Sequence, residues 1–266
     1  MRNNPIGVFD SGVGGLTVVK ELMRELPYED IVYFGDTARV PYGVKSKETI
    51  IRFSLENILF LLKKEVKLIC VACNTVSSLA LPVIKGHFRV PIVGVIFPGA
   101  KEAVYATKNK RVGVIGTRAT IKSRAYEKEI INIDSSIKIF TQSCPLFVPF
   151  VEEGWIKQRS VFDVASFYLE PLKKAKIDTL ILGCTHYPLL KNIIQEVMGK
   201  NVLLIDSAVQ VAREVKTVLN DENCLNIKKR GSIQKFYVSD EPTSFFDLGK
   251  SFLGKKIIQV ERIDNV

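Results

Sequence analysis

The sequence predicts an α/β fold made of two similar lobes, each built on a parallel sheet. Short apolar, β-branched runs alternate along the chain with longer amphipathic segments, as strand–helix units do. The short runs are apolar throughout, which is expected of strands that are covered on both faces. A pattern found early in the chain also returns later. These three observations favour parallel sheets in two related halves.

Ten short runs are predicted to be strands. In chain order they are Ile6–Phe9, Ile31–Phe34, Leu68–Ala72, Ile92–Ile96, Val112–Ile115, Ile137–Phe140, Leu180–Leu182, Val202–Ile205, Gln234–Val238 and Ile257–Val260. The segments between them have helical periodicity. The clearest stripe places apolar residues at i, i+4, i+7, i+8 and i+11, namely Ile51, Leu55, Ile58, Leu59 and Leu62. We interpret these stripes as core-facing.

The repeated pattern has two parts in each half. Ile6–Ser11 resembles Val112–Thr117, because both are strands that run into a small, hydroxyl-bearing turn. Leu68–Thr75 resembles Thr179–His186, because both are buried-type strands that end in cysteine and polar residues. The two parts are separated by about the same length of chain in each half. Two matches at similar spacing predict two related lobes.

The stretch after about residue 206 has no counterpart in the repeat, and we expect it to return to the first lobe. The predicted division therefore assigns 1–96 plus 206–266 to the first α/β lobe. The second α/β lobe is predicted to be 97–205.

Composition and charge exclude several classes of protein. The 266 residues are 47% hydrophobic and 25% charged, which is ordinary globular composition. The formal net charge of +10 permits anionic partners, but the basic residues are scattered and only Lys228–Arg230 forms a tight triplet. Nucleic-acid binding is therefore not expected to be the main function.

The sequence shows no signal-peptide or membrane-spanning pattern and no disulfide framework, and these features bear on where the protein is expected to act and on the state of its thiols. The N-terminal segment lacks the apolar stretch of a signal peptide, and the longest apolar segment, Ile58–Leu62, is too short to cross a membrane. Five widely spread cysteines do not form a disulfide framework. We expect a cytoplasmic protein with reduced thiols and no membrane contact.

Polar side chains are expected where the strands end. They occur as Asp10-Ser11, Asp36-Thr37, Cys73-Asn74-Thr75, Thr117 and Cys184-Thr185-His186. In parallel α/β sheets, ligands bind at the carboxyl ends of the strands. Each residue taken alone is more often a helix cap or a satisfied turn residue. Several such ends together favour a binding site.

Two thiols stand out among the five cysteines. Cys70 and Cys73 match a redox C-x-x-C spacing, but Cys70 lies inside a strand, so a dithiol switch is not expected. A zinc site from Cys70, Cys73, Cys184 and His186 is formally possible but lacks standard ligand spacing, and no metal is expected. One thiol per lobe remains, Cys73 and Cys184. Two facing thiols can act as base and acid on opposite sides of one carbon, which suits racemisation.

A glycine loop follows the first predicted strand, at Gly12, Gly14 and Gly15. It lacks the ending of a P-loop and the spacing of a dinucleotide site. We expect its glycines to let backbone N–H groups approach a small anion such as a carboxylate.

Five segments resemble the glutamate racemases of the aspartate/glutamate racemase family. They are FDSGVGGLTV (Phe9–Val18), YFGDTARVPYG (Tyr33–Gly43), CNTVSS (Cys73–Ser78), CPLFVPFVEEG (Cys144–Gly154) and GCTHYPLL (Gly183–Leu190). They fall in the family's order and cover the chain to about residue 210. The pairing of GCTHYPLL with D-S-G-x-G-G is highly specific.

The resemblance implies two lobes related by pseudo-twofold symmetry, with the active site in the cleft between them. It implies that L- and D-glutamate interconvert without a cofactor, with Cys73 deprotonating the D-enantiomer and Cys184 the L-enantiomer. Asp10 and His186 would assist the thiols. The implied substrate-binding residues are Asp10, Ser11, Pro41, Tyr42, Gly43, Asn74, Thr75, Thr185 and His186, with Asp36, Glu152 and Thr117 as secondary residues.

The resemblance also implies a homodimer that supplies D-glutamate for peptidoglycan. Three alternatives stay open at this point. The first is a sister racemase that acts on aspartate or another amino acid. The second is a non-catalytic amino-acid sensor on the same scaffold. The third is a secondary role on nucleic acid or a topoisomerase, which the net charge permits.

Overall fold

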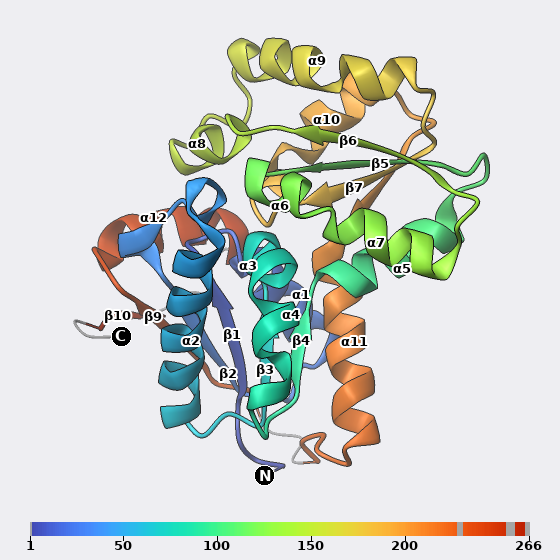
Figure 1. The fold of residues 1–266 in the computed structure, drawn as a ribbon. Helices are drawn as coiled ribbons and strands as arrows, with labels where there is room; N and C mark the ends of the chain where they lie inside the picture. Colours follow the sequence, from blue (N-terminus) through green and yellow to red (C-terminus); the bar gives the residue numbers. More distant parts are fainter. Residues whose placement is uncertain (1, 228–230, 254–258, 264–266) are drawn as a thin grey trace.

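The computed structural model describes residues 2–227, 231–253 and 259–263, and these form two separate parallel sheets (Figure 1). The six-stranded sheet has the order β10-β9-β2-β1-β3-β4 and the four-stranded sheet the order β6-β5-β7-β8. Every pairing in both sheets is parallel. The predicted fold class, two α/β lobes with parallel sheets, is confirmed.

The first lobe contains the six-stranded sheet. Its strands are β1 (Ile6–Asp10), β2 (Ile31–Gly35), β3 (Leu68–Val71), β4 (Ile92–Gly94), β9 (Gln234–Val238) and β10 (Val260–Arg262). Its helices are α1 (Leu16–Glu25), η1 (Thr37–Arg39), η2 (Tyr42–Val44), α2 (Lys47–Lys63), α3 (Asn74–Leu79), α4 (Leu81–Ile84), η3 (Lys85–His87) and α12 (Pro242–Leu253).

The second lobe contains the four-stranded sheet. Its strands are β5 (Arg111–Gly116), β6 (Lys138–Ser143), β7 (Thr179–Gly183) and β8 (Leu203–Asp206). Its helices are α5 (Ile96–Ala106), α6 (Arg118–Ser123), α7 (Ala125–Ile133), α8 (Phe147–Glu152), α9 (Arg159–Lys174), η4 (Tyr187–Leu190) and α10 (Lys191–Met198).

The internal repeat is visible in the strand order. In the first sheet β1 lies between β2 and β3, with β4 outside β3, and in the second sheet β5 lies between β6 and β7, with β8 outside β7. The sequence pairs β1 with β5 and β3 with β7, and these strands hold equivalent places. The strands that end in Cys73 and Cys184 are therefore topological counterparts.

Alternate side chains of the first sheet enter two different cores. Ile6, Val8 and Cys70 pack in the cluster that includes α1, whereas Phe9 and Val71 pack in the cluster that includes α2. The α1 cluster continues into the second lobe through β7 and α8, so the two lobes share one apolar core.

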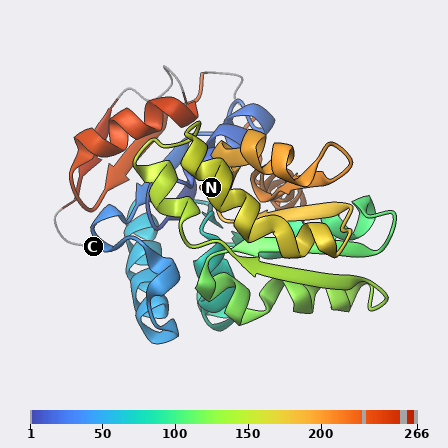
Figure 2. The same ribbon diagram turned by 90° about the horizontal axis from the view of Figure 1, so that it is seen from above.

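One long helix leads from the second lobe back to the first. The carboxylate of Asp206 caps α11 (Ser207–Asp221) by accepting from the Ala208 N–H at 3.0 Å. The helix buries Val211 and Val215 and packs against α1 and α5. The chain then adds β9 and β10 to the first sheet, as Figures 1 and 2 show in red. The lobe boundaries at about 97 and 206 stay a prediction.

Three strand predictions need correction. The run Ile92–Ile96 is a strand only to Gly94, because its partner β3 ends at Val71 and offers no further backbone partner. Strand β6 is half-exposed rather than covered on both faces, because it lies at the edge of its sheet. The last strand is Val260–Arg262 rather than Ile257–Val260, and 254–258 lie outside the described residues. No described helix is long and apolar enough to span a membrane.

Candidate active site

Strand ends and loops from both sheets enclose one small cavity of about 20 Å³. It is lined by Ser11, Val40, Pro41, Tyr42, Gly43, Cys73, Asn74, Thr75, Thr117, Val148, Cys184, Thr185 and His186. Both singled-out thiols line it, one from each lobe. Every residue expected to bind substrate lines it except Asp10. The volume corresponds to about one water molecule.

The Cys73 thiol lies at the start of α3, directly after β3. Its sulfur is 3.7 Å from the Ser11 hydroxyl oxygen, and the residue is almost fully buried. Burial and then the nearby Asp10 carboxyl group raise the pKa of Cys73 to about 12, although the Val76 N–H and the Ser11 hydroxyl lower it; the Cys184 sulfur adds the smallest effect. Cys73 is therefore a protonated thiol at neutral pH.

The Cys184 thiol lies at the end of β7 and has a different partner. Its sulfur is 3.8 Å from Nδ1 of His186, whose Nε2 is 3.2 Å from Oε1 of Glu152 in α8. Burial alone would lower the pKa of His186, but the Cys184 sulfur and the Glu152 carboxylate outweigh it and raise the pKa to about 10. An imidazolium therefore faces Cys184 at neutral pH. Glu152 lies behind His186, outside the cavity lining.

The carboxylate of Asp10 joins the two lobes at the end of β1. It accepts hydrogen bonds from the Gly12 N–H at 3.1 Å and from the Thr185 hydroxyl at 3.3 Å. Burial raises the pKa of Asp10, and the positive charge of His186 opposes that rise. Asp10 is fully buried behind Ser11 and acts on Cys73 through its charge.

Polar groups that can hold a substrate surround the thiols. The Tyr126 hydroxyl of α7 donates to Oδ1 of Asn74 at 2.7 Å, which fixes the amide. Nδ2 of Asn74 is buried and has no hydrogen-bond partner among the described residues. Such a donor costs free energy unless a ligand accepts from it. The hydroxyls of Thr75, Thr117 and Thr120 lie within 3.0–3.4 Å of one another across the lobes.

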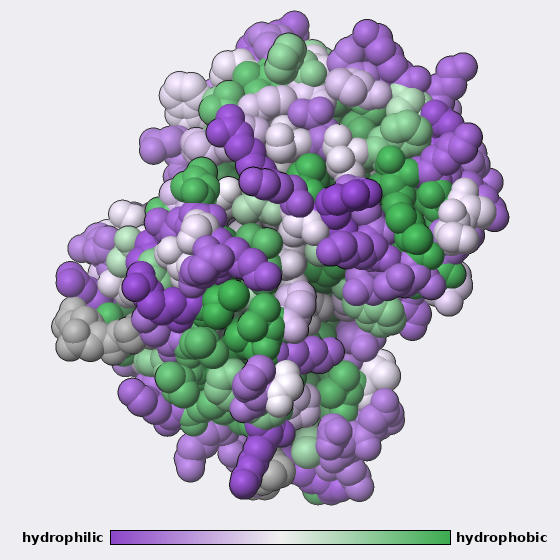
Figure 3. Space-filling model, in the orientation of Figure 1, coloured by the Kyte–Doolittle hydropathy of each residue, from purple (hydrophilic) through white to green (hydrophobic). Residues whose placement is uncertain are grey.

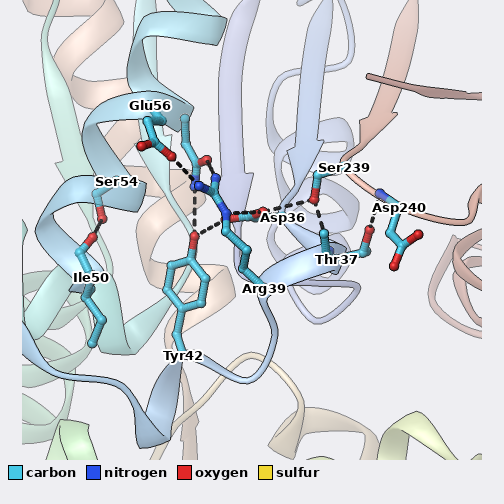
Figure 4. A network of polar contacts seen from close by, with 11 residues as sticks. Asp36, Thr37, Arg39, Tyr42, Ile50, Ser54, Glu56, Ser239 and Asp240 are labelled. Atoms are coloured by element: carbon cyan, nitrogen blue, oxygen red, sulfur yellow. Dashed lines mark hydrogen bonds and ion pairs between the residues drawn. The ribbon is translucent and has the colours of Figure 1, made fainter. Parts of the chain in front are cut away.

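Asp36, expected as a secondary polar residue of the site, does not line the cavity. Its fully buried carboxylate accepts from the Tyr42 hydroxyl, from Nε of Arg39 at 2.7 and 2.9 Å, and from the Ser239 hydroxyl at 2.9 Å (Figure 4). Arg39 also pairs with Glu56. Asp36 therefore fixes the loop whose Tyr42 lines the cavity.

We expect Ser239→Ala to weaken substrate binding without touching the cavity. The Ser239 hydroxyl donates to Asp36 and accepts from the Ala38 N–H at 3.0 Å, so its loss loosens the loop on both sides. Hydrogen bonds to a charged group contribute about 1.5–3 kcal/mol, so KM should rise by about tenfold, with a smaller change in kcat. Ser244→Ala, on the exposed side of α12, is the matched control. An unchanged KM in Ser239→Ala would contradict this role.

The glycines of the loop after β1 lie against polar side chains from both lobes. A Cβ on Gly14 would lie 2.4 Å from the Thr185 hydroxyl oxygen and 2.6 Å from Nδ1 of His186. A Cβ on Gly15 would lie 2.5 Å from the Asp10 Cβ. The lack of a side chain at Gly14 and Gly15 therefore lets the loop pack directly against Thr185, His186 and Asp10. The backbone N–H groups of Gly12 and Gly15 both hydrogen-bond to the carboxyl group of Asp10.

The remaining cysteines, Cys70, Cys144 and Cys224, do not line the cavity. Cys70 packs in the α1 core, on the opposite face of the sheet from Cys73, and burial raises its pKa to about 12. Within the described ranges, no group of three or more histidine, cysteine or acidic side chains is arranged to hold a metal ion. Tyr126, Thr120 and Ser239 contribute to the site, yet no sequence motif marks them.

The family model for Asp/Glu/Hydantoin racemase matches residues 6–215. The chain belongs to this racemase family. Membership makes it an enzyme of the isomerase class, and the matched residues include both thiols and every residue of the cavity.

Relatives of this racemase family cover nearly the full chain. A protein of Geobacter metallireducens named glutamate racemase is 49% identical over 258 residues, covering 97% of this chain and 96% of its own. A solved glutamate racemase isoform of Bacillus anthracis has a TM-score of 0.96 at 39% identity, covering 99% and 98%. A solved Francisella tularensis glutamate racemase in complex with D-glutamate has a TM-score of 0.92 at 41% identity, with the same coverage.

Proposed function

We propose that this protein is a glutamate racemase that uses Cys73 and Cys184 as its two acid–base groups and no cofactor. The observation that carries the proposal is that the two thiols line one cavity from opposite lobes, each with its own polar partner. A pair of groups on opposite sides of a carbon can remove a proton from one face and return one to the other. The full-length relatives named glutamate racemase support the choice of substrate.

In the L-to-D direction, the Cys184 thiolate takes the α-proton and Cys73 donates its thiol proton to the opposite face. The electron pair of the broken C–H bond forms the new C–H bond to the proton from Cys73. Cys184 ends as a thiol and Cys73 as a thiolate, and the D-to-L direction reverses each step. The His186 imidazolium stabilises the Cys184 thiolate by its charge.

The α-proton of an amino acid is weakly acidic, so the site must stabilise a carbanion-like transition state. The unpartnered Nδ2 of Asn74 and the Thr75 hydroxyl are the donors that we assign to the substrate carboxylates. Thr185 lines the same cavity, and its hydroxyl proton is donated to Asp10. Asp10, buried at the end of β1, is the carboxyl group that we assign to the substrate ammonium. A cavity of about 20 Å³ is too small for glutamate, so the lobes must separate to admit it.

The substrate assignment is tested by a panel of L-glutamate, L-aspartate and L-glutamine, followed by polarimetry. We expect the highest kcat/KM with glutamate, since a site that pairs with a carboxylate rejects analogues that cannot place one there. Faster turnover of aspartate would assign the chain to the sister activity. Binding of glutamate without any loss of rotation would favour a sensor.

We further propose a cytoplasmic homodimer that supplies D-glutamate for peptidoglycan.

The contact between Glu152 and His186 leads to a prediction about the pH dependence of the reaction. The imidazolium is kept by neighbours that raise its pKa to about 10, so kcat/KM should fall as the pH rises through that value. Glu152→Gln removes one of the two groups that raise this pKa, so the alkaline limb should move toward neutral pH. Glu153→Gln is the control, because Glu153 is the next residue in the chain and His186 contacts Glu152. If the alkaline limb of the pH profile did not move in Glu152→Gln, the claim that Glu152 raises the pKa of His186 would be contradicted.

A further inference from the structure

A second groove opens on the outer side of the same interlobe seam. It has a volume of about 620 Å³ and is formed by the loop from Gly43 to Lys47, by Leu79 of α3, and by α6 of the second lobe. Helix α6 packs directly against η2. Figure 3 shows a mainly hydrophilic surface where the two lobes meet on this face. The groove is large enough for a small amino acid with its hydration, whereas the catalytic cavity is not.

The charged side chains that line this groove all have the same sign. They are Lys45 and Lys47 from the first lobe and Arg118 and Lys122 from the second, and no acidic residue lines it. None of the four has an ion pair within the described parts of the chain. Lys47 has an acidic neighbour in sequence, Glu48, whose pKa is lowered mainly by its own backbone N–H and the Ser46 hydroxyl and least by Lys47. Like charges that face each other across a seam repel unless an anion lies between them.

The groove and the catalytic cavity share one residue, Gly43. Thr117 lines the cavity, and its neighbour Arg118 lines the groove. A Cβ on Gly43 would lie 2.7 Å from the Thr117 Cβ, so these two residues are in direct contact. The Gly43–Thr117 contact is therefore the wall between groove and cavity, and it is a contact between the lobes.

We propose that this basic groove is an outer capture site for the dicarboxylate substrate, which passes between Gly43 and Thr117 into the cavity when the lobes separate. The inference rests on the proposed function. Glutamate carries two carboxylates and a net negative charge at neutral pH. A cleft lined by charges of one sign raises the local concentration and association rate of an oppositely charged ligand. Lys45 and Lys122, one from each lobe, are the residues that we assign to this capture.

The test compares two double variants that lose the same charge. Lys45→Gln/Lys122→Gln changes the groove, and Lys173→Gln/Lys200→Gln changes the opposite edge of the second sheet, near the starts of β7 and β8. The kcat and kcat/KM for L-glutamate are measured over a range of ionic strength. At low salt the groove variant should lose about three- to tenfold in kcat/KM with unchanged kcat. The difference should vanish at high salt, because screening removes the advantage of the wild type.

Each other outcome overturns the inference. An equal loss in both double variants would assign the effect to net charge, and a loss that persists at high salt would assign it to local packing. Lys45→Arg/Lys122→Arg keeps the charges and should restore the wild-type salt dependence, so a failure to do so also counts against capture. A wild-type protein without glutamate racemisation would overturn the proposed function itself, which is a result distinct from these.

Discussion

Replacing either Cys73 or Cys184 with alanine is expected to abolish racemisation while the fold is retained. Each variant removes the only acid–base group on one side of the substrate carbon. General acid–base groups contribute about 10²–10⁴ in rate, so each single variant should lose at least about 100-fold in kcat. The loss should be equally severe in the L-to-D and D-to-L directions, since each direction uses both thiols.

Cys224→Ala is the matched control, because this thiol is half-buried in the segment after α11, outside the cavity. It should retain full activity. The unfolding temperature of all three variants should stay close to that of the wild type, which separates a lost reaction from a lost fold. Full activity in Cys73→Ala or Cys184→Ala would exclude the two-thiol reaction.

Among substitutions that mutate none of the proposed catalytic residues, Gly14→Ala is expected to cause the largest loss of activity. Its Cβ would lie 2.4 Å from the Thr185 hydroxyl oxygen and 2.6 Å from Nδ1 of His186, so these side chains must move. Overpacking typically costs about 1–3 kcal/mol in unfolding free energy. A displacement of about 1 Å at a catalytic group can cost 100-fold in rate, so kcat should fall far more than stability.

Gly86→Ala provides the comparison, because a Cβ at Gly86 meets no atom within 4 Å. That variant should keep both its activity and its unfolding free energy. If Gly14→Ala retained wild-type kcat, the close packing of the glycine loop against His186 would not matter for the reaction.

Much of this architecture was predictable because its determinants are local in sequence. Apolar runs predicted the strands, and the repeated pattern anticipated the shared order of β2-β1-β3-β4 and β6-β5-β7-β8. Since parallel strands present their carboxyl ends at one edge, polar residues at those ends were expected to cluster. Cys73 and Cys184 do line one cavity.

The features that escaped prediction depend on contacts between distant parts of the chain. Ser239 reaches Asp36 across 203 residues, from a segment that carries no motif. Tyr126 reaches Asn74 from the other lobe. The sequence placed Asp36 at a strand end but could not show that Arg39, Tyr42 and Ser239 turn its carboxylate away from the cavity. The close packing of Gly14 against Thr185 and His186 was not predicted for the same reason, because these two residues lie in the second lobe.

The central claim, two thiols acting on opposite faces of one carbon, is tested most directly by racemisation in D2O at low conversion. The purified wild-type protein is incubated with L-glutamate, and the α-position of both enantiomers is followed by NMR after chiral separation. The account predicts that D-glutamate carries deuterium from its first appearance while the remaining L-glutamate stays protonated. Product that retains the original proton would contradict it, because a single group would then be moving that proton from one face to the other.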